Sequence, residues 1–267
     1  MELRDYLNKA KKGKWAMGQF NFSTLEQLRG IMKAAVKMKS PVILGTSEGE
    51  LKFLGIKQAV ALVEILKLDY NIPAFLNLDH GKDLSLIKKA IDYGFSAVHF
   101  DGSLLSLEKN INYAKKVANL AHKKGLIVEG EIDDIKKKSL TKLSEAKKFV
   151  YKTKVDSLAI AIGSIHGYYK SVSLDFEALR ELAENLSVYL VLHGGSGISN
   201  SQIKKAVKLG INKVNINTEL RMAWKQGVEK GFGKKEIKPY KVLFKAEKAV
   251  QKKVEEKIKL FSSFNKI

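Results

Sequence analysis

The chain has 267 residues, a formal net charge of +20 at pH 7 and no cysteine. This length matches the roughly 250 residues of one eight-stranded α/β barrel, although it could also hold two smaller domains. Without cysteine there are no disulfides, thiolate metal sites or cysteine nucleophiles, so a metal would need histidine or carboxylate ligands. The sequence contains no uninterrupted apolar run of about 18 residues, so no membrane span is predicted. The charged N-terminus lacks the apolar core of a signal peptide. We therefore expect a cytoplasmic enzyme with no membrane partner.

The positive charge comes almost entirely from lysines. They are scattered along the expected helices, without the clusters of basic and stacking aromatic residues that are typical of nucleic-acid-binding proteins. We interpret them as a solvated surface and expect no nucleic-acid partner, although a positive field favours the approach of an anionic substrate. A nucleic-acid-binding protein is the alternative that rests on charge alone, and it predicts steeply salt-dependent binding.

Eight short, largely apolar segments alternate with longer segments of helical periodicity. The expected strands cover residues 16–22, 41–47, 74–80, 97–103, 126–132, 157–164, 189–195 and 213–219. Such alternation predicts parallel strands joined by right-handed crossovers, and eight units close into a (β/α)8 TIM barrel. An open doubly wound sheet is the structural alternative, but the dinucleotide fingerprint that often marks it is absent. A further amphipathic helix is expected from Tyr240 to about Phe261, and no linker divides the chain, so we expect one domain over residues 1–267.

Three of the five histidines fall at or just after the ends of expected strands. His80 ends the third strand, His166 follows the sixth and His193 lies at the end of the seventh. The carboxyl ends of barrel strands form the active site, so three imidazoles there would supply a zinc site with an open coordination position. Cobalt, iron or manganese could occupy the same ligands. His99, inside the fourth strand, and His122, on a helix, are expected to be ordinary structural residues.

A glycine-rich loop, HGGSG, covers residues 193–197 between the seventh strand and the next helix. Glycines let backbone N–H groups approach a phosphate, aided by the helix N-terminus. Barrels often bind phosphate after strands seven and eight, and Asn215, Asn217 and Thr218 lie at the end of the eighth. The sequence therefore predicts a phosphate site beside the expected metal.

These segments resemble the class II, metal-dependent fructose-bisphosphate/tagatose-bisphosphate aldolases. The matching segments are GQFNFSTLEQLRGI, PVILGTSEGE, LNLDHG, AVHFDGS, VEGEI, LAIAIGSIHGYY, LVLHGGSGI and KVNINTEL. They appear in the family's order and cover nearly the whole chain. The resemblance implies an aldolase on a TIM barrel, active on a ketose bisphosphate and commonly assembled as a homodimer or homotetramer.

The resemblance also implies residue roles. His80, His166 and His193 would bind the catalytic zinc, Asp79 would be the general acid/base at the C4 hydroxyl, and Glu131 would be an alternate or outer metal ligand. The implied substrate- and phosphate-binding residues are Asn21, Ser47, Gly167, Gly194, Ser196, Asn215, Asn217 and Thr218. Backbone carbonyls around the two HG turns would hold a monovalent cation, Na+ or K+.

One segment departs from the family pattern. Many members continue after the fifth strand with a longer loop containing GG…ED, whose acidic residue is a second proton-transfer group. Here the chain reads EIDDIKKKSLTKLSEAKKF, which is shorter and lacks those glycines. Asp133 or Asp134 could take the role of the second proton-transfer group, or both could be solvated loop residues without a catalytic role. A lysine Schiff base is disfavoured, because Lys213, at the edge of an expected strand, is the only lysine within these strands.

The leading hypothesis is reversible cleavage of fructose 1,6-bisphosphate to dihydroxyacetone phosphate and glyceraldehyde 3-phosphate. A tagatose-bisphosphate aldolase differs only in the stereochemistry at C4. A non-catalytic metal- or sugar-phosphate-binding barrel is the alternative from another class, and the shortened loop motivates it.

Overall fold

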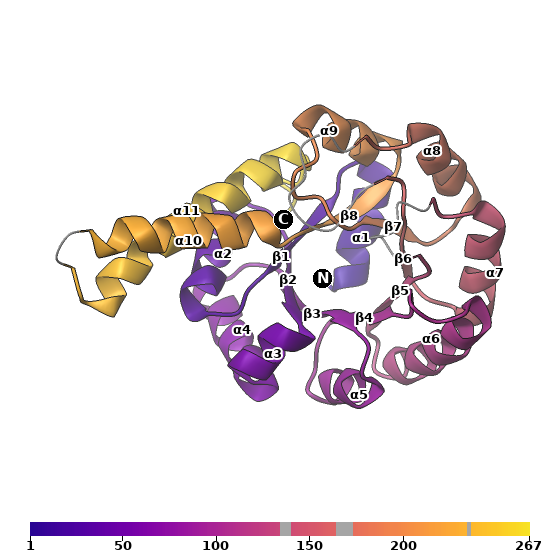
Figure 1. Ribbon diagram of the computed structural model, residues 1–267, viewed down its shortest axis with the longest axis horizontal. Coiled ribbons are helices and arrows are strands. Elements are labelled where there is room, and N and C mark those ends of the chain that lie inside the picture. The colour runs from indigo at the N-terminus through magenta and orange to yellow at the C-terminus, as the bar shows by residue number, and fades with distance from the viewer. Residues whose placement is uncertain (134–139, 164–172, 234–235) are drawn as a thin grey trace.

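The computed structural model describes residues 1–133, 140–163, 173–233 and 236–267. Within these ranges, parallel strands pair in sequence order and close on themselves, with the last strand beside the first (Figure 1). The strands are β1 (Met17–Asn21), β2 (Val42–Ser47), β3 (Ala74–Gly81), β4 (Ala97–Asp101), β5 (Ile127–Glu131), β6 (Ser157–Ala159), β7 (Tyr189–Leu192) and β8 (Ile211–Ile216). The predicted (β/α)8 barrel is confirmed, and the open doubly wound alternative is excluded.

Helices surround the strands. They are α1 (Leu3–Gly13), α2 (Leu25–Met38), α3 (Glu48–Leu54), α4 (Ile56–Tyr70), α5 (Leu84–Asp92), α6 (Leu107–His122), α7 (Leu143–Thr153), α8 (Phe176–Asn185), α9 (Asn200–Leu209), α10 (Thr218–Phe232) and α11 (Pro239–Leu260). The additional C-terminal helix expected from Tyr240 is α11. Among the described helices, none is long and apolar enough to cross a bilayer.

Strand side chains alternate between two separate apolar clusters. Val42 and Leu44 face outward and pack against the surrounding helices, while Ile43 between them faces the barrel interior. Both faces of each strand are therefore covered, which explains why several strands read as continuous apolar runs.

Helix α1 closes the amino end of the barrel. Its residues Leu3, Tyr6, Leu7 and Ala10 recur at helical spacing and are buried. They form one cluster with the inward-facing side chains near the strands' amino ends, namely Met17, Ile43, Phe75, Ala97, Ile127 and Tyr189. The apolar plug leaves the carboxyl end of the strands as the open end of the barrel.

Helices α10 and α11 pack side by side and extend beyond the ring of helices (Figure 1). A side chain at Gly227 would place its Cβ 2.5 Å from the backbone of Ala246, so glycine permits this close approach. On its other side, α11 packs against α2, where the buried carboxylate of Glu247 binds Arg29 and Lys33. The C-terminal helix is thus fixed to the barrel wall next to β1.

Candidate functional site

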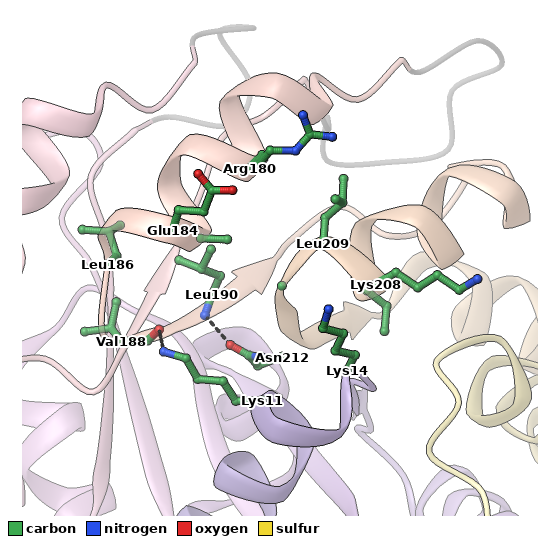
Figure 2. Close-up of a pocket in the computed structure, with 13 residues that line it drawn as sticks. Lys11, Lys14, Arg180, Glu184, Leu186, Val188, Leu190, Lys208, Leu209 and Asn212 are labelled. Carbon is green, nitrogen blue, oxygen red and sulfur yellow. Dashed lines mark hydrogen bonds between the residues drawn. The ribbon is translucent and has the colours of Figure 1, made fainter.

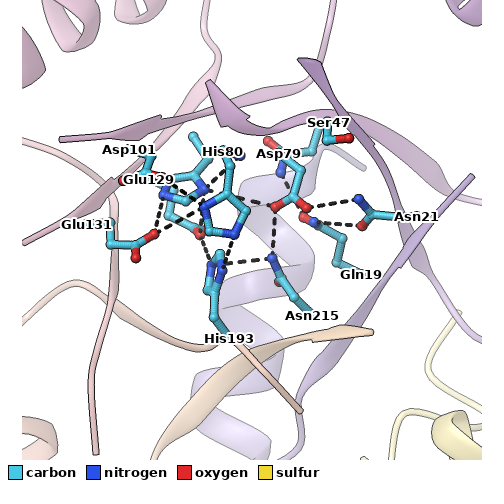
Figure 3. Close-up of polar contacts among 12 residues, drawn as sticks. Gln19, Asn21, Ser47, Asp79, His80, Asp101, Glu129, Glu131, His193 and Asn215 are labelled. Carbon is cyan, nitrogen blue, oxygen red and sulfur yellow. Dashed lines mark hydrogen bonds and ion pairs between the residues drawn. The ribbon is translucent and has the colours of Figure 1, made fainter. Parts of the chain in front are cut away.

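A register shift in β3 brings two consecutive polar residues to the open end of the barrel. Neighbouring side chains of a regular strand point to opposite faces. Between Leu78 and Gly81 the register against β4 shifts by one residue, and His80 adopts a left-handed backbone with φ of 52°. Asp79 and His80 therefore both face the interior (Figure 3). A Cβ at position 81 would meet the His99 carbonyl at 3.0 Å, so this bulge requires a glycine.

The imidazoles of His80 and His193 face each other at the mouth. Nε2 of His80 lies 3.1 Å from Nδ1 of His193. Two ligands joined to one zinc by bonds of about 2.0–2.1 Å at the tetrahedral angle would lie roughly 3.3 Å apart. Nε2 of His193 contacts the Glu129 carboxylate at 2.7 Å, which leaves its Nδ1 directed toward His80. A carboxylate behind a histidine in this way orients the ring for metal binding.

Carboxylates lie on the other edge of His80. Its Nδ1 is 3.3 Å from Asp101 and 3.4 Å from Glu131. Oε2 of Glu131 is buried and has no hydrogen-bond partner among the described residues, which a bound cation would remedy. Two overlapping groups of potential metal ligands meet here, one formed by Asp79, His80, His99 and His193 and the other by His80, Asp101 and Glu131. Imidazole nitrogens and carboxylate oxygens suit zinc or a similar divalent metal.

The site holds its acidic groups ionised. Burial disfavours the charged forms, but the neighbouring imidazoles outweigh it and hold the pKa of Asp79 well below its ordinary value. The same balance lowers the pKa of Glu131 to about 2. Burial likewise opposes protonation of His80, yet Asp79 and the carboxylates beyond it raise its pKa well above the ordinary value. Burial lowers the pKa of His193, which favours the neutral imidazole that metals bind.

Two asparagines orient the Asp79 carboxylate. Asn21 donates to Oδ2 at 2.9 Å, and Asn215 donates to Oδ1 at 3.1 Å (Figure 3). The amide of Asn21 also donates to Glu50, whose carboxylate accepts the backbone N–H of Ser47 as well. Asp79 is therefore fixed as an acceptor facing the mouth.

Glu50 is a site residue that was not predicted from the sequence, although a signal was present. Ser47 and Glu50 form a reciprocal capping box at the start of α3. The same carboxylate also accepts from Asn217 at 3.2 Å and from Arg221 at 2.7 Å. One buried glutamate thus connects side chains that enter the mouth from three sides.

A cavity of about 360 Å³ opens at this end of the barrel. Its lining comprises Ser47, Asp79, His80, His193, Gly194, Ser196, Asn215, Asn217, Thr218 and Arg221. The structure thus brings most of the predicted residues to one cavity, with Asn21 behind Asp79 and Glu131 beside His80. Two of the predicted residues, His166 and Gly167, lie outside the described residues, as does Asp134.

The glycine-rich loop is fixed from behind by Glu219, on the first turn of α10. The backbone N–H of Glu219 donates to Ser196 Oγ at 3.3 Å, and its side chain accepts the N–H of Gly197 at 3.3 Å. Lys257 of α11, a buried residue, lies 2.6 Å from the same carboxylate. The loop and the N-terminus of α10, at Thr218, thus face the cavity together, as an anion site requires.

Several boundaries and positions differ from the sequence expectations. β7 ends at Leu192, so His193 follows the strand, and β8 ends at Ile216, so Asn217 precedes the first turn of α10. β8 begins at Ile211, which places Lys213 inside the strand, not at its edge. Its ammonium group lies 2.6 Å from Glu129, below the cavity, so the disfavoured Schiff-base mechanism gains no support.

Asp133 and the two remaining histidines can also be placed. Asp133 accepts a hydrogen bond from Thr141 Oγ1 at 2.6 Å and does not line the cavity. His122 contacts Asp156 at 2.8 Å on the outer surface, as expected of a structural residue. His99 was expected to be similar, but it is fully buried inside the metal-ligand cluster, with its ring centroid 4.7 Å from that of His80.

A second hollow, of about 340 Å³, lies at the opposite end of the strands between α1, α8 and α9. Lys11, Lys14, Arg180 and Lys208 surround it (Figure 2). The ammonium group of Lys11 donates to the backbone carbonyls of Ser187 and Val188. The lining of this hollow contains no histidine, and none of the predicted site residues lies there.

Comparison with known proteins identifies the family. The model of class II fructose-bisphosphate aldolases matches residues 1–266. The chain belongs to this family. It is therefore an aldolase, a carbon–carbon lyase of a family that acts on sugar phosphates and generally depends on a metal.

Relatives of this aldolase carry different substrate names. A 6-phospho-5-dehydro-2-deoxy-D-gluconate aldolase from Shouchella clausii is 38% identical over 96% of this chain and 92% of its own length. A fructose-bisphosphate aldolase from Geobacillus stearothermophilus is 36% identical over 100% of this chain and 98% of its own length. The crystal structure of the YdjI aldolase from Escherichia coli K12 superposes with a TM-score of 0.90 at 32% identity, covering 100% of this chain and 98% of that chain.

Proposed function

We propose that this aldolase is zinc-dependent and reversibly cleaves fructose 1,6-bisphosphate to dihydroxyacetone phosphate and glyceraldehyde 3-phosphate. The observation that carries the proposal is the position of Asp79. Its carboxylate is held ionised beside His80 and His193 in a cavity that also contains the glycine-rich loop. Base, metal ligands and phosphate loop thus meet where one sugar bisphosphate would fit.

In cleavage, Asp79 accepts the proton of the C4 hydroxyl while the C3–C4 bond breaks, so that C4 becomes the aldehyde of the leaving product. The electron pair of that bond passes to C3 and is delocalised into the C2 carbonyl. A divalent metal, when bound, polarises this carbonyl as a Lewis acid. A proton taken up through solvent at C3 then gives dihydroxyacetone phosphate, and Asp79 releases its proton to solvent, so the protons balance. Asp79 returns the proton in the condensation direction, and Asn21 and Asn215 keep its carboxylate aligned throughout.

His80, His166 and His193 are the proposed zinc ligands, and Glu131 is the alternate or outer one. The facing nitrogens of His80 and His193, together with the unsatisfied oxygen of Glu131, support this set. His166 remains a prediction from the sequence, as does the monovalent cation, Na+ or K+, at the HG turns.

The phosphate and ketose would occupy the corner between the glycine-rich loop and α10. The proposed contacts are Asn21, Ser47, Gly167, Gly194, Ser196, Asn215, Asn217 and Thr218. Backbone N–H groups and hydroxyls at a helix start bind phosphate well, which supports this placement. A homo-oligomeric state, a cytoplasmic location and a single domain over residues 1–267 remain predictions.

Fructose 1,6-bisphosphate is favoured by the Geobacillus stearothermophilus relative, which is named a fructose-bisphosphate aldolase and is matched over 98% of its length. Tagatose 1,6-bisphosphate is the alternative that differs only at C4. The Shouchella clausii relative is named for a phosphorylated deoxygluconate. This substrate carries a phosphate at one end and a carboxylate at the other, whereas the two ketoses carry a phosphate at each end.

The test is a cleavage assay with purified, zinc-loaded protein on all three substrates, with the triose phosphate or aldehyde product detected directly. We expect the highest kcat/KM on fructose 1,6-bisphosphate. Faster cleavage of either other substrate would replace the substrate proposal while leaving the chemistry intact. Failure to cleave any sugar phosphate, with zinc bound and a known aldolase active in parallel, would favour the non-catalytic binding barrel.

A further inference from the structure

His99 belongs to one of the two groups of potential metal ligands, but both of its ring nitrogens face atoms of neighbouring residues. Its ring is fully buried and lies within 5.0 Å, centroid to centroid, of both His80 and His193. The backbone N–H of His80 donates to its Nδ1 at 3.1 Å. That nitrogen is therefore an occupied acceptor, and in the neutral ring the proton sits on Nε2. In this arrangement both ring nitrogens are directed at protein groups, which favours a role behind the metal ligands.

The contact with His80 explains how the bulge in β3 is maintained. At the register shift between β3 and β4, the His80 N–H donates to a side chain of β4, the imidazole of His99. A left-handed backbone at a residue other than glycine costs about 1–3 kcal/mol and persists only where the surroundings enforce it. The His99 ring can enforce this backbone, since it accepts the His80 N–H and its centroid lies 4.7 Å from that of His80.

The other ring nitrogen faces a second proposed metal ligand. Nε2 of His99 lies 3.1 Å from Oε2 of Glu131, in an alignment short of a good hydrogen bond. Neither atom has a hydrogen-bond partner among the described residues, so the Nε2 proton has only this carboxylate to face. Glu131 Oε2 in turn lies 3.4 Å from His80 Nδ1. One imidazole thus contacts the backbone of one ligand and the side chain of another.

We propose that His99 is a positioning residue that sets the metal geometry of this aldolase by holding His80 in its bulge and directing Glu131. This inference rests on the proposed function, because it takes His80 and Glu131 as metal ligands. The behaviour expected is that of residues behind metal ligands, whose loss typically lowers metal affinity about 10–100-fold.

Three variants separate the two contacts. His99→Asn keeps an acceptor near the Nδ1 position, His99→Gln keeps a donor near the Nε2 position, and His99→Leu keeps neither. His122→Asn is the matched control, since His122 is a surface histidine paired with Asp156 far from the mouth. Metal affinity is measured by competition with a chromophoric chelator, and ligand geometry by the visible spectrum of the Co²⁺-loaded protein.

We expect His99→Leu to bind Zn²⁺ about 10–100-fold more weakly and to show an altered Co²⁺ spectrum, with Asn and Gln intermediate and His122→Asn unchanged. Wild-type affinity and spectrum in His99→Leu would overturn the inference, as would a loss of thermal stability alone. If the leucine variant does not fold, wild-type affinity and spectrum in both Asn and Gln variants would overturn it equally.

The two proposals fail in different ways. A wild-type protein that binds metal and cleaves sugar phosphates, with His99 variants indistinguishable in affinity and spectrum, leaves the proposed function intact and removes this inference. A wild-type protein that binds neither Zn²⁺ nor Co²⁺ removes both.

Discussion

The ammonium group of Lys213 lies 2.6 Å from the carboxylate of Glu129, and both side chains are buried inside the barrel. The other oxygen of Glu129 contacts His193. Burial opposes ionisation of Glu129, but Lys213 outweighs it and keeps the pKa of Glu129 well below the ordinary value. A buried charge from β8 thereby fixes the carboxylate that orients a proposed zinc ligand.

Replacing Lys213 with Met should therefore destabilise the fold by about 3–5 kcal/mol, because it leaves a buried carboxylate without its partner. Denaturant unfolding of the variant measures this loss. The double change Lys213→Met with Glu129→Gln should recover much of it, since no uncompensated charge remains. Lys230→Met, on the exposed face of α10, is the matched control and should have no effect. Equal free energies of unfolding for Lys213→Met and the wild type would show that the Lys213–Glu129 pair does not stabilise the fold.

Replacing Asp79 with Asn should lower kcat by about 10²–10⁴-fold, the usual contribution of a positioned general base. The amide retains the shape and one acceptor of the carboxylate, so zinc content, measured by metal analysis, should remain near that of the wild type. A variant with normal zinc content and undiminished kcat would remove Asp79 from the reaction.

Removing the metal with a chelator should lower the free energy of unfolding. Without the cation, four carboxylates and three imidazoles of the described cluster remain close together. At a free metal concentration 100 times Kd, the bound ion adds roughly 2.7 kcal/mol to the free energy of unfolding. Urea titrations with and without Zn²⁺ test this, and Ca²⁺ serves as a control ion that prefers oxygen ligands. Coincident unfolding curves would speak against a metal centre.

Replacing Lys257 with Met should raise KM for the sugar phosphate about three- to tenfold, equivalent to roughly 0.7–1.4 kcal/mol, with little change in kcat. The reason is that Lys257 holds Glu219, which binds the N–H of Gly197 behind the phosphate loop. Steady-state kinetics give the split, and Lys259→Met, on the exposed side of α11, is the matched control. A change confined to kcat would contradict this account.

Replacing Asp133 with Asn should stabilise the protein at neutral pH without altering kcat. Burial, and then the nearby Glu145 and Glu131, raise the pKa of Asp133, although Thr141 and Lys142 act in the opposite direction. A carboxyl group with a raised pKa binds its proton more tightly when folded, so the stability it contributes falls as pH rises through that pKa.

The stability difference between Asp133→Asn and the wild type should accordingly vanish below the ordinary carboxyl pKa of about 3.9 and appear above it. Thermal unfolding across this pH range measures the difference. A strongly reduced kcat would instead identify Asp133 as the missing second proton-transfer group.

The barrel could be predicted from the sequence because each strand is short and largely apolar, and the segment after it has apolar residues at helical spacing. The sequence also predicted most of the cavity, since polar residues at strand ends such as Asp79 and Asn215 must meet at one end of a parallel barrel. The plug formed by α1 was missed because its four buried residues are spaced among lysines and acidic residues. His166 belongs to residues 164–172, which lie outside the described residues, so its role stays a prediction from the sequence.

The bulge at His80 and the role of His99 could not be predicted locally. Regular alternation would have turned His80 outward, and only the pairing of β3 with β4 reveals the one-residue shift. The sequence predicted a structural role in the core for His99, because its strand neighbours Val98 and Phe100 are apolar. Its partners lie 19 and 32 positions away in sequence, at His80 and Glu131, so no local pattern contains them.

Within the described part of the chain, the apolar plug closes the amino end of the barrel and leaves access from the carboxyl end. Among the described residues, Leu3, Tyr6 and Leu7 seal the amino end, and the cavity beside Asp79 is the route by which ions and sugars reach the histidine cluster. A sugar phosphate seated there would stand between the cluster and bulk water. Metal must then arrive first and leave last, so turnover itself should protect the enzyme from chelators, and an idle enzyme should lose its metal soonest.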